Sequence, residues 1–312
     1  RRHASALVNV NGSVGRGSAA VDLNAIPTAA LDRIEVLRDG ASAQYGSDAI
    51  AGVVNLLLRE EREGGGLTVT YGGYDTSVEP ARSSRDANDG ETVTISGWQG
   101  LGLGQDGFLT VSAEYLQRGS TSRGDIDPAL LPAQIVNSRF GDPEVEQYTI
   151  YANAGVPLGG DWEAYGWLGY QNRDSTSAAF PRRADNVNNV TAIYPNGFLP
   201  LINIVSQDIT AAGGVRGELG GWDVDVSLVY GRNQLDFRTE NSLNSTYGAA
   251  SQKSFDDGAL IYGQTVLGVD FTRSLGAPGL AAPINFAWGF EARRETYEIE
   301  AGEPASYNRG PA

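Results

Sequence analysis

The stretch that decides the fold runs Arg33-Ile-Glu-Val-Leu-Arg-Asp-Gly-Ala-Ser-Ala-Gln-Tyr-Gly-Ser-Asp-Ala-Ile-Ala-Gly-Val-Val-Asn55. Its first six residues alternate between charged and apolar, which is the period-two pattern of a strand. A turn is predicted at Asp39-Gly40, helical character at residues 41–48, and a second strand in the apolar run 51–58. Upstream, Ile26-Pro27 begins a short helical turn, since proline is tolerated at a helix start. These features predict a small α+β unit that is too short to be a complete domain.

From Asp22 to Asn55, the sequence resembles the C-terminal half of the plug domain of TonB-dependent outer-membrane receptors. The family pattern is Ile-Pro, Arg-Ile-Glu-Val, Gly, a small residue, Tyr-Gly and then Ala-x-x-Gly-Val-Ile-Asn, and about thirty-five residues match it in order and spacing. One departure is Asp39-Gly40, where many members have Gly-Pro, but either pair makes a turn. The resemblance implies that residues 1–62 are the C-terminal part of a plug domain and residues 63–312 the N-terminal part of a transmembrane β-barrel.

Eight residues of the matching stretch are candidate functional residues. In a plug, the charged ones would meet polar groups on the inner barrel wall, where a desolvated ion pair is costly to break. The alternative is that they form the solvated edge of a small sheet. The glycines are expected at turns or close packing points, and the tyrosine offers a large apolar body with a polar tip. The eight residues are Arg33, Glu35, Arg38, Gly40, Tyr45, Gly46, Gly52 and Asn55.

After the plug-like stretch, the sequence alternates between apolar and polar residues in nine segments of strand length. In one of them, Trp222, Val224 and Leu228 face one way while Asp223 and Asp225 face the other. Long strands with one apolar and one polar face suit a wall between lipid and water. The predicted strands are residues 66–74, 91–101, 107–118, 146–157, 161–172, 207–219, 221–237, 259–274 and 284–299.

Short and long connections alternate along these strands. The short ones are 102–107, 157–161, 220–221 and 276–283, and the long ones are 75–90, 119–145, 173–206 and 238–258. Outer-membrane barrels show this alternation because their periplasmic turns are tight and their external loops are long. A soluble β-sandwich is the other candidate, although long loops at every second connection are unusual for it.

The predicted fold class is therefore mainly β: a partial antiparallel transmembrane β-barrel preceded by the end of a small α+β plug domain. A barrel that encloses a plug needs about twenty-two strands. We therefore expect the chain to be a piece of a longer protein, without the TonB-contacting segment and the closing strands. Expressed alone, such a piece is expected to aggregate through its unpaired strand edges.

Composition excludes several classes of function. The chain has no cysteine, so disulfides and thiolate sites are ruled out, and its one histidine, His3, leaves no catalytic triad or histidine-rich metal cluster. A net charge of −15 argues against a nucleic-acid partner, which needs a basic surface. Gly102 to Gly107 matches G-x-G-x-x-G, but a strand follows instead of the helix that a dinucleotide requires. We predict no enzyme activity, no cofactor and no metal site.

The resemblance implies a receptor in the outer membrane of a Gram-negative bacterium, which takes up a large, scarce solute such as an iron-siderophore with energy from a TonB-type coupling protein. Cobalamin and glycan receptors share this architecture, so the small-molecule or metal-chelate ligand stays open. Outer-membrane lipid would surround the barrel. The alternative is a passive porin-like or adhesive barrel without TonB coupling. Four loop aromatics either line the ligand entry or pack the loops together: Phe180, Tyr194, Phe198 and Tyr247.

Overall fold

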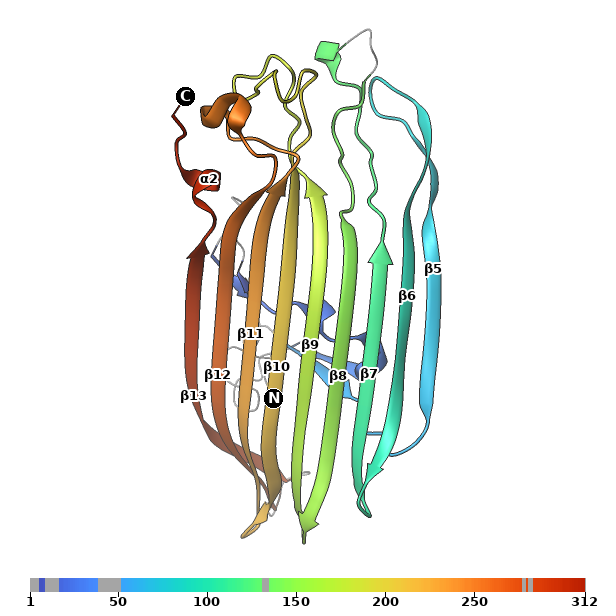
Figure 1. Ribbon diagram of the computed structural model, residues 1–312. Helices are drawn as coiled ribbons and strands as arrows, with labels where there is room; N and C mark the ends of the chain where they lie inside the picture. Colours follow the sequence, from blue (N-terminus) through green and yellow to red (C-terminus); the bar gives the residue numbers. More distant parts are fainter. Residues whose placement is uncertain are drawn as a thin grey trace.

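The computed structural model describes residues 6–8, 17–38, 52–130, 135–276, 279 and 283–311. Nine long strands form one sheet in which each strand pairs with its neighbours in the sequence (Figure 1). All of these pairings are antiparallel, so the mainly β fold is confirmed. The strands are β5 (Gly65–Val78), β6 (Arg85–Leu103), β7 (Gly107–Arg118), β8 (Glu144–Gly159), β9 (Trp162–Ala178), β10 (Leu201–Leu219), β11 (Trp222–Glu240), β12 (Phe255–Leu275) and β13 (Ile284–Ala301).

Every predicted strand is present, but most extend beyond the range predicted for them. The connection between β5 and β6 is residues 79–84, not 75–90, and the one between β9 and β10 is residues 179–200, not 173–206. The predicted loops were too long because the residues at their margins, which belong to strands in the structure, are largely polar and lack the apolar alternation of a strand. They still pair through main-chain hydrogen bonds, which do not depend on apolar side chains.

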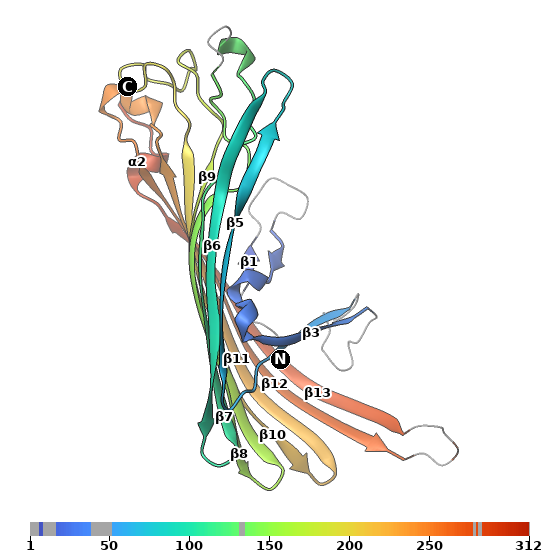
Figure 2. The same cartoon turned by 90° about the vertical axis from the view of Figure 1, so that its right-hand side faces the viewer.

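The connections alternate between the two ends of the sheet. Residues 104–106, 160–161, 220–221 and 276–283 join strands at one end, and residues 79–84, 119–143, 179–200 and 241–254 join them at the other (Figures 1 and 2). Gly220 and Gly221 have φ of 62° and 79°. A two-residue hairpin of this kind needs positive φ at both positions, which glycine adopts without strain. The predicted alternation of tight turns and longer loops is therefore confirmed from β6 to β12. It is wrong for the connection between β5 and β6, which at residues 79–84 is shorter than residues 276–283. The G-x-G-x-x-G match is one of the tight turns.

The two faces of the curved sheet reverse the usual distribution of polarity. On β8, Ile150 is 54% exposed whereas Thr149 is 0% exposed. On β9, Leu168 is 56% exposed whereas Gln171 is 1% exposed. Apolar side chains therefore cover the convex face, and polar side chains are buried on the concave face.

An N-terminal segment lies in the hollow of the sheet (Figure 2). Its β1 (Leu7–Val8) pairs with β2 (Ala19–Ala20), and β3 (Leu31–Leu37) pairs antiparallel with β4 (Val53–Leu58). The helical turn predicted to begin at Ile26-Pro27 is the 3-10 helix η2 (Thr28–Ala30), and a further 3-10 helix, η1 (Leu23–Ala25), precedes it. The helix predicted at residues 41–48 lies outside the described residues. The predicted domain boundary at residues 62 and 63 falls between β4 and β5.

The remaining helices are one or two turns long and lie among the longer connections and after β13. No helix within the described residues is long and apolar enough to cross a membrane. These elements are η3 (Pro128–Leu130), η4 (Ser245–Ala250) and α2 (Pro304–Tyr307).

Candidate functional site

A buried ion pair joins the N-terminal segment to the concave face of the sheet. The carboxylate of Asp22 lies 2.9 Å from Nη1 of Arg173 on β9, and the two side chains are 8% and 20% exposed. The other carboxylate oxygen of Asp22 accepts the main-chain N–H of Asn24 at 3.0 Å, so the same side chain caps η1. Asp22 thus caps η1 and also bonds to the sheet across the contact region between the N-terminal segment and the concave face, which we call the seam.

Neighbouring residues of the concave face support this pair. Arg173 Nε donates to Oε1 of Gln147 at 2.8 Å, and Gln147 Nε2 donates to Oγ1 of Thr149 at 3.1 Å. Gln171 Nε2 donates to the carbonyl oxygen of Asn24 at 2.6 Å. The inward-facing side chains of β8 and β9 therefore form a connected hydrogen-bond network that holds Arg173 in place and also bonds to η1.

A small apolar cluster lies beside the polar network. Tyr151 on β8 is 3% exposed and packs with Ile26 and Ala30 of the N-terminal segment. Leu56 and Trp167 extend this cluster from β4 and β9. Burying a large apolar side chain stabilises a contact by about 1.5–3 kcal/mol, so this cluster adds a hydrophobic component to the seam.

Residues 59–64, which lead from β4 into β5, follow the inner wall closely. The N–H of Glu61 donates to Oγ1 of Thr110 at 2.9 Å, and the same hydroxyl donates back to the carbonyl of Glu61 at 3.1 Å. Asn153 Nδ2 donates to the carbonyl of Arg59 at 2.9 Å. A Cβ on Gly100 would meet the carbonyl oxygen of Glu61 at 2.8 Å. Main-chain atoms of this linker are therefore bonded directly to the strands of the wall.

Five of the eight predicted plug-motif residues lie within the described residues, on or directly beside β3 and β4. Arg33 Nε lies 2.8 Å from Oε1 of Glu35, both side chains are about half exposed, and Asn55 Nδ2 donates to Glu35 at 3.4 Å. Arg38 is exposed. A Cβ on Gly52 would lie 2.5 Å from the carbonyl oxygen of Leu37, which is the close approach expected of this glycine.

A barrel-contacting role for Arg33, Glu35 and Arg38 stays a prediction. Gly40, Tyr45 and Gly46 lie outside the described residues. The contacts that the structure does show across the seam come from Asp22, Asn24, the apolar residues Ile26, Ala30 and Leu56, and residues 59–62, none of which was among the eight candidates. Asp22 is the first residue of the plug-like stretch, so the resemblance to the family could have pointed to it. Arg173 lay in a predicted loop, and nothing in the sequence marked it as a contact residue.

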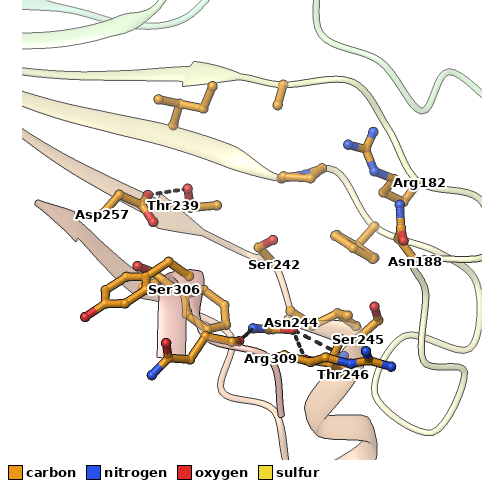
Figure 3. A pocket seen from close by; sticks show the side chains of 18 residues that line it. Arg182, Asn188, Thr239, Ser242, Asn244, Ser245, Thr246, Asp257, Ser306 and Arg309 are labelled. Atoms are coloured by element: carbon orange, nitrogen blue, oxygen red, sulfur yellow. Dashed lines mark hydrogen bonds between the residues drawn. The ribbon is translucent and has the colours of Figure 1, made fainter. Parts of the chain in front are cut away.

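The longer connections form a cleft at the other end of the sheet. It has a volume of about 630 Å³ and is lined by individual residues of the segments 179–202, 239–257 and 306–309 (Figure 3). Arg182 and Arg309 contribute cationic groups, and Asp257 contributes an anionic group that accepts the Thr239 hydroxyl at 2.5 Å. The lining therefore combines charged and hydrogen-bonding groups with apolar surface from residues such as Phe198.

The four predicted loop aromatics are not equivalent. Tyr194 stacks on Phe198 with ring centroids 4.5 Å apart, and its hydroxyl donates to the carbonyl of Ser242 at 3.3 Å. Phe198 also lines the cleft, whereas Phe180 is 71% exposed outside it. Tyr247 lies next to Gly310 at the edge of η4. Tyr194 and Phe198 are thus joined by packing, and a role for any of the four in ligand entry stays a prediction.

Ion pairs and hydrogen bonds connect successive loops to one another. Asp127 lies 3.5 Å from Arg183 of the next connection. The pKa of Asp127 is held below its usual range because the main-chain N–H of Ala129 and the side-chain amide of Asn137 donate to its carboxylate. In the parts of the chain that the structure describes, no three or more His, Cys, Asp or Glu residues gather as a metal site would require.

Comparison with known proteins agrees with this architecture. Residues 3–53 match the family model of the TonB-dependent Receptor Plug Domain. The match confirms the plug resemblance found in the sequence, and in this chain the matching segment is followed by a sheet of nine antiparallel strands. Over 108 residues it is 37% identical to the "Vitamin B12 transporter BtuB" of Photobacterium profundum.

Among solved structures, the chain is similar to that of BauA, the "Ferric preacinetobactin receptor" from Acinetobacter baumannii. The TM-score is 0.51 at 13% identity, covering 88% of this chain and 49% of that one, so the likeness concerns the fold. The match to the vitamin B12 transporter covers 33% of this chain and 17% of that protein. The chain thus spans half or less of the length of these relatives.

Proposed function

We propose that this chain is part of an outer-membrane receptor of a Gram-negative bacterium, which imports a large, scarce solute with energy supplied through a TonB-type protein. One observation carries the proposal: a segment that matches the receptor plug lies on a polar concave wall and is bonded to it through Asp22 and Arg173. A passive pore needs no such obstruction. The exposed apolar convex face supports a lipid environment around the strands.

The ligand is proposed to be a small molecule or metal chelate, with an iron-siderophore as the first candidate. The cleft among the longer connections has a volume of about 630 Å³, and pockets for ligands of several hundred daltons span about 300–1,000 Å³. Its two arginines favour a solute with anionic groups, and its hydroxyl and amide groups favour one rich in hydrogen-bonding atoms. The proposal assigns no catalytic step to any residue.

Uptake by the complete receptor in living cells tests this function. A strain that lacks the receptor is compared with the same strain carrying it, using a panel of radiolabelled ferric siderophores and cyanocobalamin. We expect receptor-dependent accumulation of one class of solute, and loss of that accumulation when the coupling protein is deleted or the proton motive force is collapsed. Accumulation that persists without the coupling protein would instead support a passive barrel. Cell adhesion without any solute uptake would support an adhesive one.

A further inference from the structure

A second cleft lies at the same end of the sheet as the one that Figure 3 shows. The hairpin of β5 and β6 lies there beside the connection between β7 and β8 (Figures 1 and 2). We call it the smaller cleft: its volume is about 390 Å³, and among the described residues it shares no lining residue with the larger one. Its lining combines one aromatic ring, two hydroxyls and two charged groups, from Tyr74, Thr76, Thr121, Arg123, Gly141 and Asp142.

Hydrogen bonds fix the polar groups of the smaller cleft in place. The guanidinium of Arg123 donates to both carboxylate oxygens of Asp89 on β6, at 2.7 and 2.9 Å. The main-chain N–H of Asp142 donates to Oγ1 of Thr121 at 2.8 Å, and the N–H of Thr121 donates to the carbonyl of Asp142 at 3.1 Å. The cleft is therefore formed in the absence of a ligand, and little ordering would be needed for binding.

Tyr74 on β5 supplies the apolar surface of the smaller cleft. Its side chain is 51% exposed, and the guanidinium of Arg123 lies 5.6 Å from its ring centre. Gly90, which has φ of 69°, lies against this ring, and a Cβ there would be 2.9 Å from Cδ2 of Tyr74. The ring is thus held between bare backbone and a fixed cation, and it presents an apolar body with a polar tip.

The charges of the smaller cleft leave one carboxylate unpaired. Arg123 is paired with Asp89, whereas no described residue forms an ion pair with the exposed carboxylate of Asp142. An anionic ligand is therefore disfavoured here, in contrast to the larger cleft with its two arginines. A hydroxyl group suits the site because it donates to a carboxylate in a charge-assisted bond and accepts from a guanidinium or a threonine hydroxyl.

We propose that the smaller cleft binds a neutral sugar ring, with Tyr74 against its C–H face and with Asp142 and Arg123 bonded to its hydroxyls. A pyranose combines an apolar face with a rim of hydroxyls that both donate and accept, which matches this lining. The inference goes beyond the proposed function, because it adds a second site and does not depend on energy-coupled uptake. The sugar belongs either to a soluble oligosaccharide or to the saccharide of a membrane lipid, and the experiment separates these two sources.

Calorimetric titration of the complete receptor tests the proposal. The receptor is purified in a detergent without a sugar headgroup, because a maltoside would itself supply the ligand. Maltotriose, cellotriose and chitotriose are the probes for a soluble source. The probe for a lipid source is the saccharide released by mild acid from the lipopolysaccharide of the producing strain. We expect one of these probes to bind at one site for each receptor.

Four variants separate the ring from the carboxylate. Tyr74→Ala should weaken binding of that probe at least about tenfold, whereas Tyr74→Phe, which keeps the ring, should stay within about threefold. Asp142→Asn should weaken it about tenfold, because a charge-assisted hydrogen bond becomes a neutral one. The matched control is Tyr71→Ala, since Tyr71 lies on the same strand, is 74% exposed and is not part of the lining. It should leave binding within about twofold.

Failure of every probe to bind the unmodified receptor at millimolar concentration would overturn the proposal. So would binding that survives both Tyr74→Ala and Asp142→Asn, because the sugar would then lie elsewhere. If Tyr74→Ala does not assemble, Asp142→Asn decides the question, since it changes an exposed group of a connection and leaves the strands unaltered. Binding is measured without a membrane potential, so a failure of the proposed uptake function would not alter this result.

Discussion

Replacing Arg173 by methionine is expected to loosen the N-terminal segment by removing the partner of a buried carboxylate. Asp22 is 8% exposed, and without the guanidinium the hydrogen bonds left to it among the described residues come from Asn24. Removing one partner of a buried ion pair costs about 3–5 kcal/mol. Because the Arg173 side chain is itself 20% exposed and water can reach the gap, we expect a loss of about 3 kcal/mol in the free energy that holds η1 to the wall.

The reciprocal change is expected to cost less. Asp22→Asn keeps an acceptor oxygen, and Arg173 remains bonded to Gln147 and partly hydrated, so a loss of about 1–2 kcal/mol is expected. The double variant carries neither charge. Its loss should be smaller than the sum of the single losses, with a coupling of at least about 1.5 kcal/mol, because no buried charge is left without a partner.

Hydrogen exchange of main-chain amides in the detergent-solubilised complete receptor measures these losses as free energies of local opening. The amide of Ala30, which donates to the carbonyl of Pro27 at 2.9 Å, reports on η2 in the segment that the Asp22–Arg173 pair holds to the sheet. Arg216→Met is the matched control, since Arg216 pairs with Glu163 at 2.7 Å on the wall but is 50% exposed. It should change the opening of the segment by less than about 1 kcal/mol. Additive losses, or equal effects of the two arginine variants, would refute the reasoning.

Three further results are expected. Gly52→Ala should destabilise the β3–β4 hairpin by about 1–3 kcal/mol, read from exchange of its amides, because the new methyl group would meet a main-chain carbonyl at 2.5 Å. The depressed pKa of Asp127 means that its contribution to loop stability is present above the ordinary carboxyl pKa and lost as the pH falls through the folded pKa. Loop exchange should therefore accelerate in acid, and Asp127→Asn should reduce that pH dependence without removing the part that Asp125 and Asp89, whose pKa values are also lowered, contribute. On the convex face, Leu228→Arg should lower folding into lipid vesicles by about 2–4 kcal/mol if this face meets lipid, whereas Asp223→Arg on the opposite face should have little effect.

The strands were predictable from the sequence because their side-chain period shows which face each residue occupies. Ile150 and Thr149 differ in exposure as the alternation requires. The strand ends were less predictable, because residues such as Asn203 extend β10 through main-chain pairing with Thr176 and carry no apolar signal. Where the local pattern is polar, only the partner strand shows that the residue belongs to a sheet.

The seam itself lay beyond prediction from the sequence. Asp22 and Arg173 are 151 residues apart. The alternation within a strand shows which residues face inward, but it does not show which of them contacts a given residue of the N-terminal segment. The motif drew the prediction toward Arg33 and Glu35, which the structure shows paired with each other at 2.8 Å. A charge pattern identifies residues able to form ion pairs, but the choice of partner depends on how the segment docks.

The polarity of the concave face explains how a segment can be held firmly there and still be released. Separating two apolar surfaces costs about 25 cal/mol for each Å² exposed, with no compensation from water. Separating hydrogen-bonded groups exchanges protein partners for water, so the net cost for each bond is only about 0.5–1.5 kcal/mol. Buried residues such as Thr149 and Gln171 therefore give the wall a surface that water can cover once the segment leaves. Separating the segment from the wall would expose apolar surface mainly at the cluster around Tyr151, so that cluster provides the main hydrophobic stabilisation of the contact.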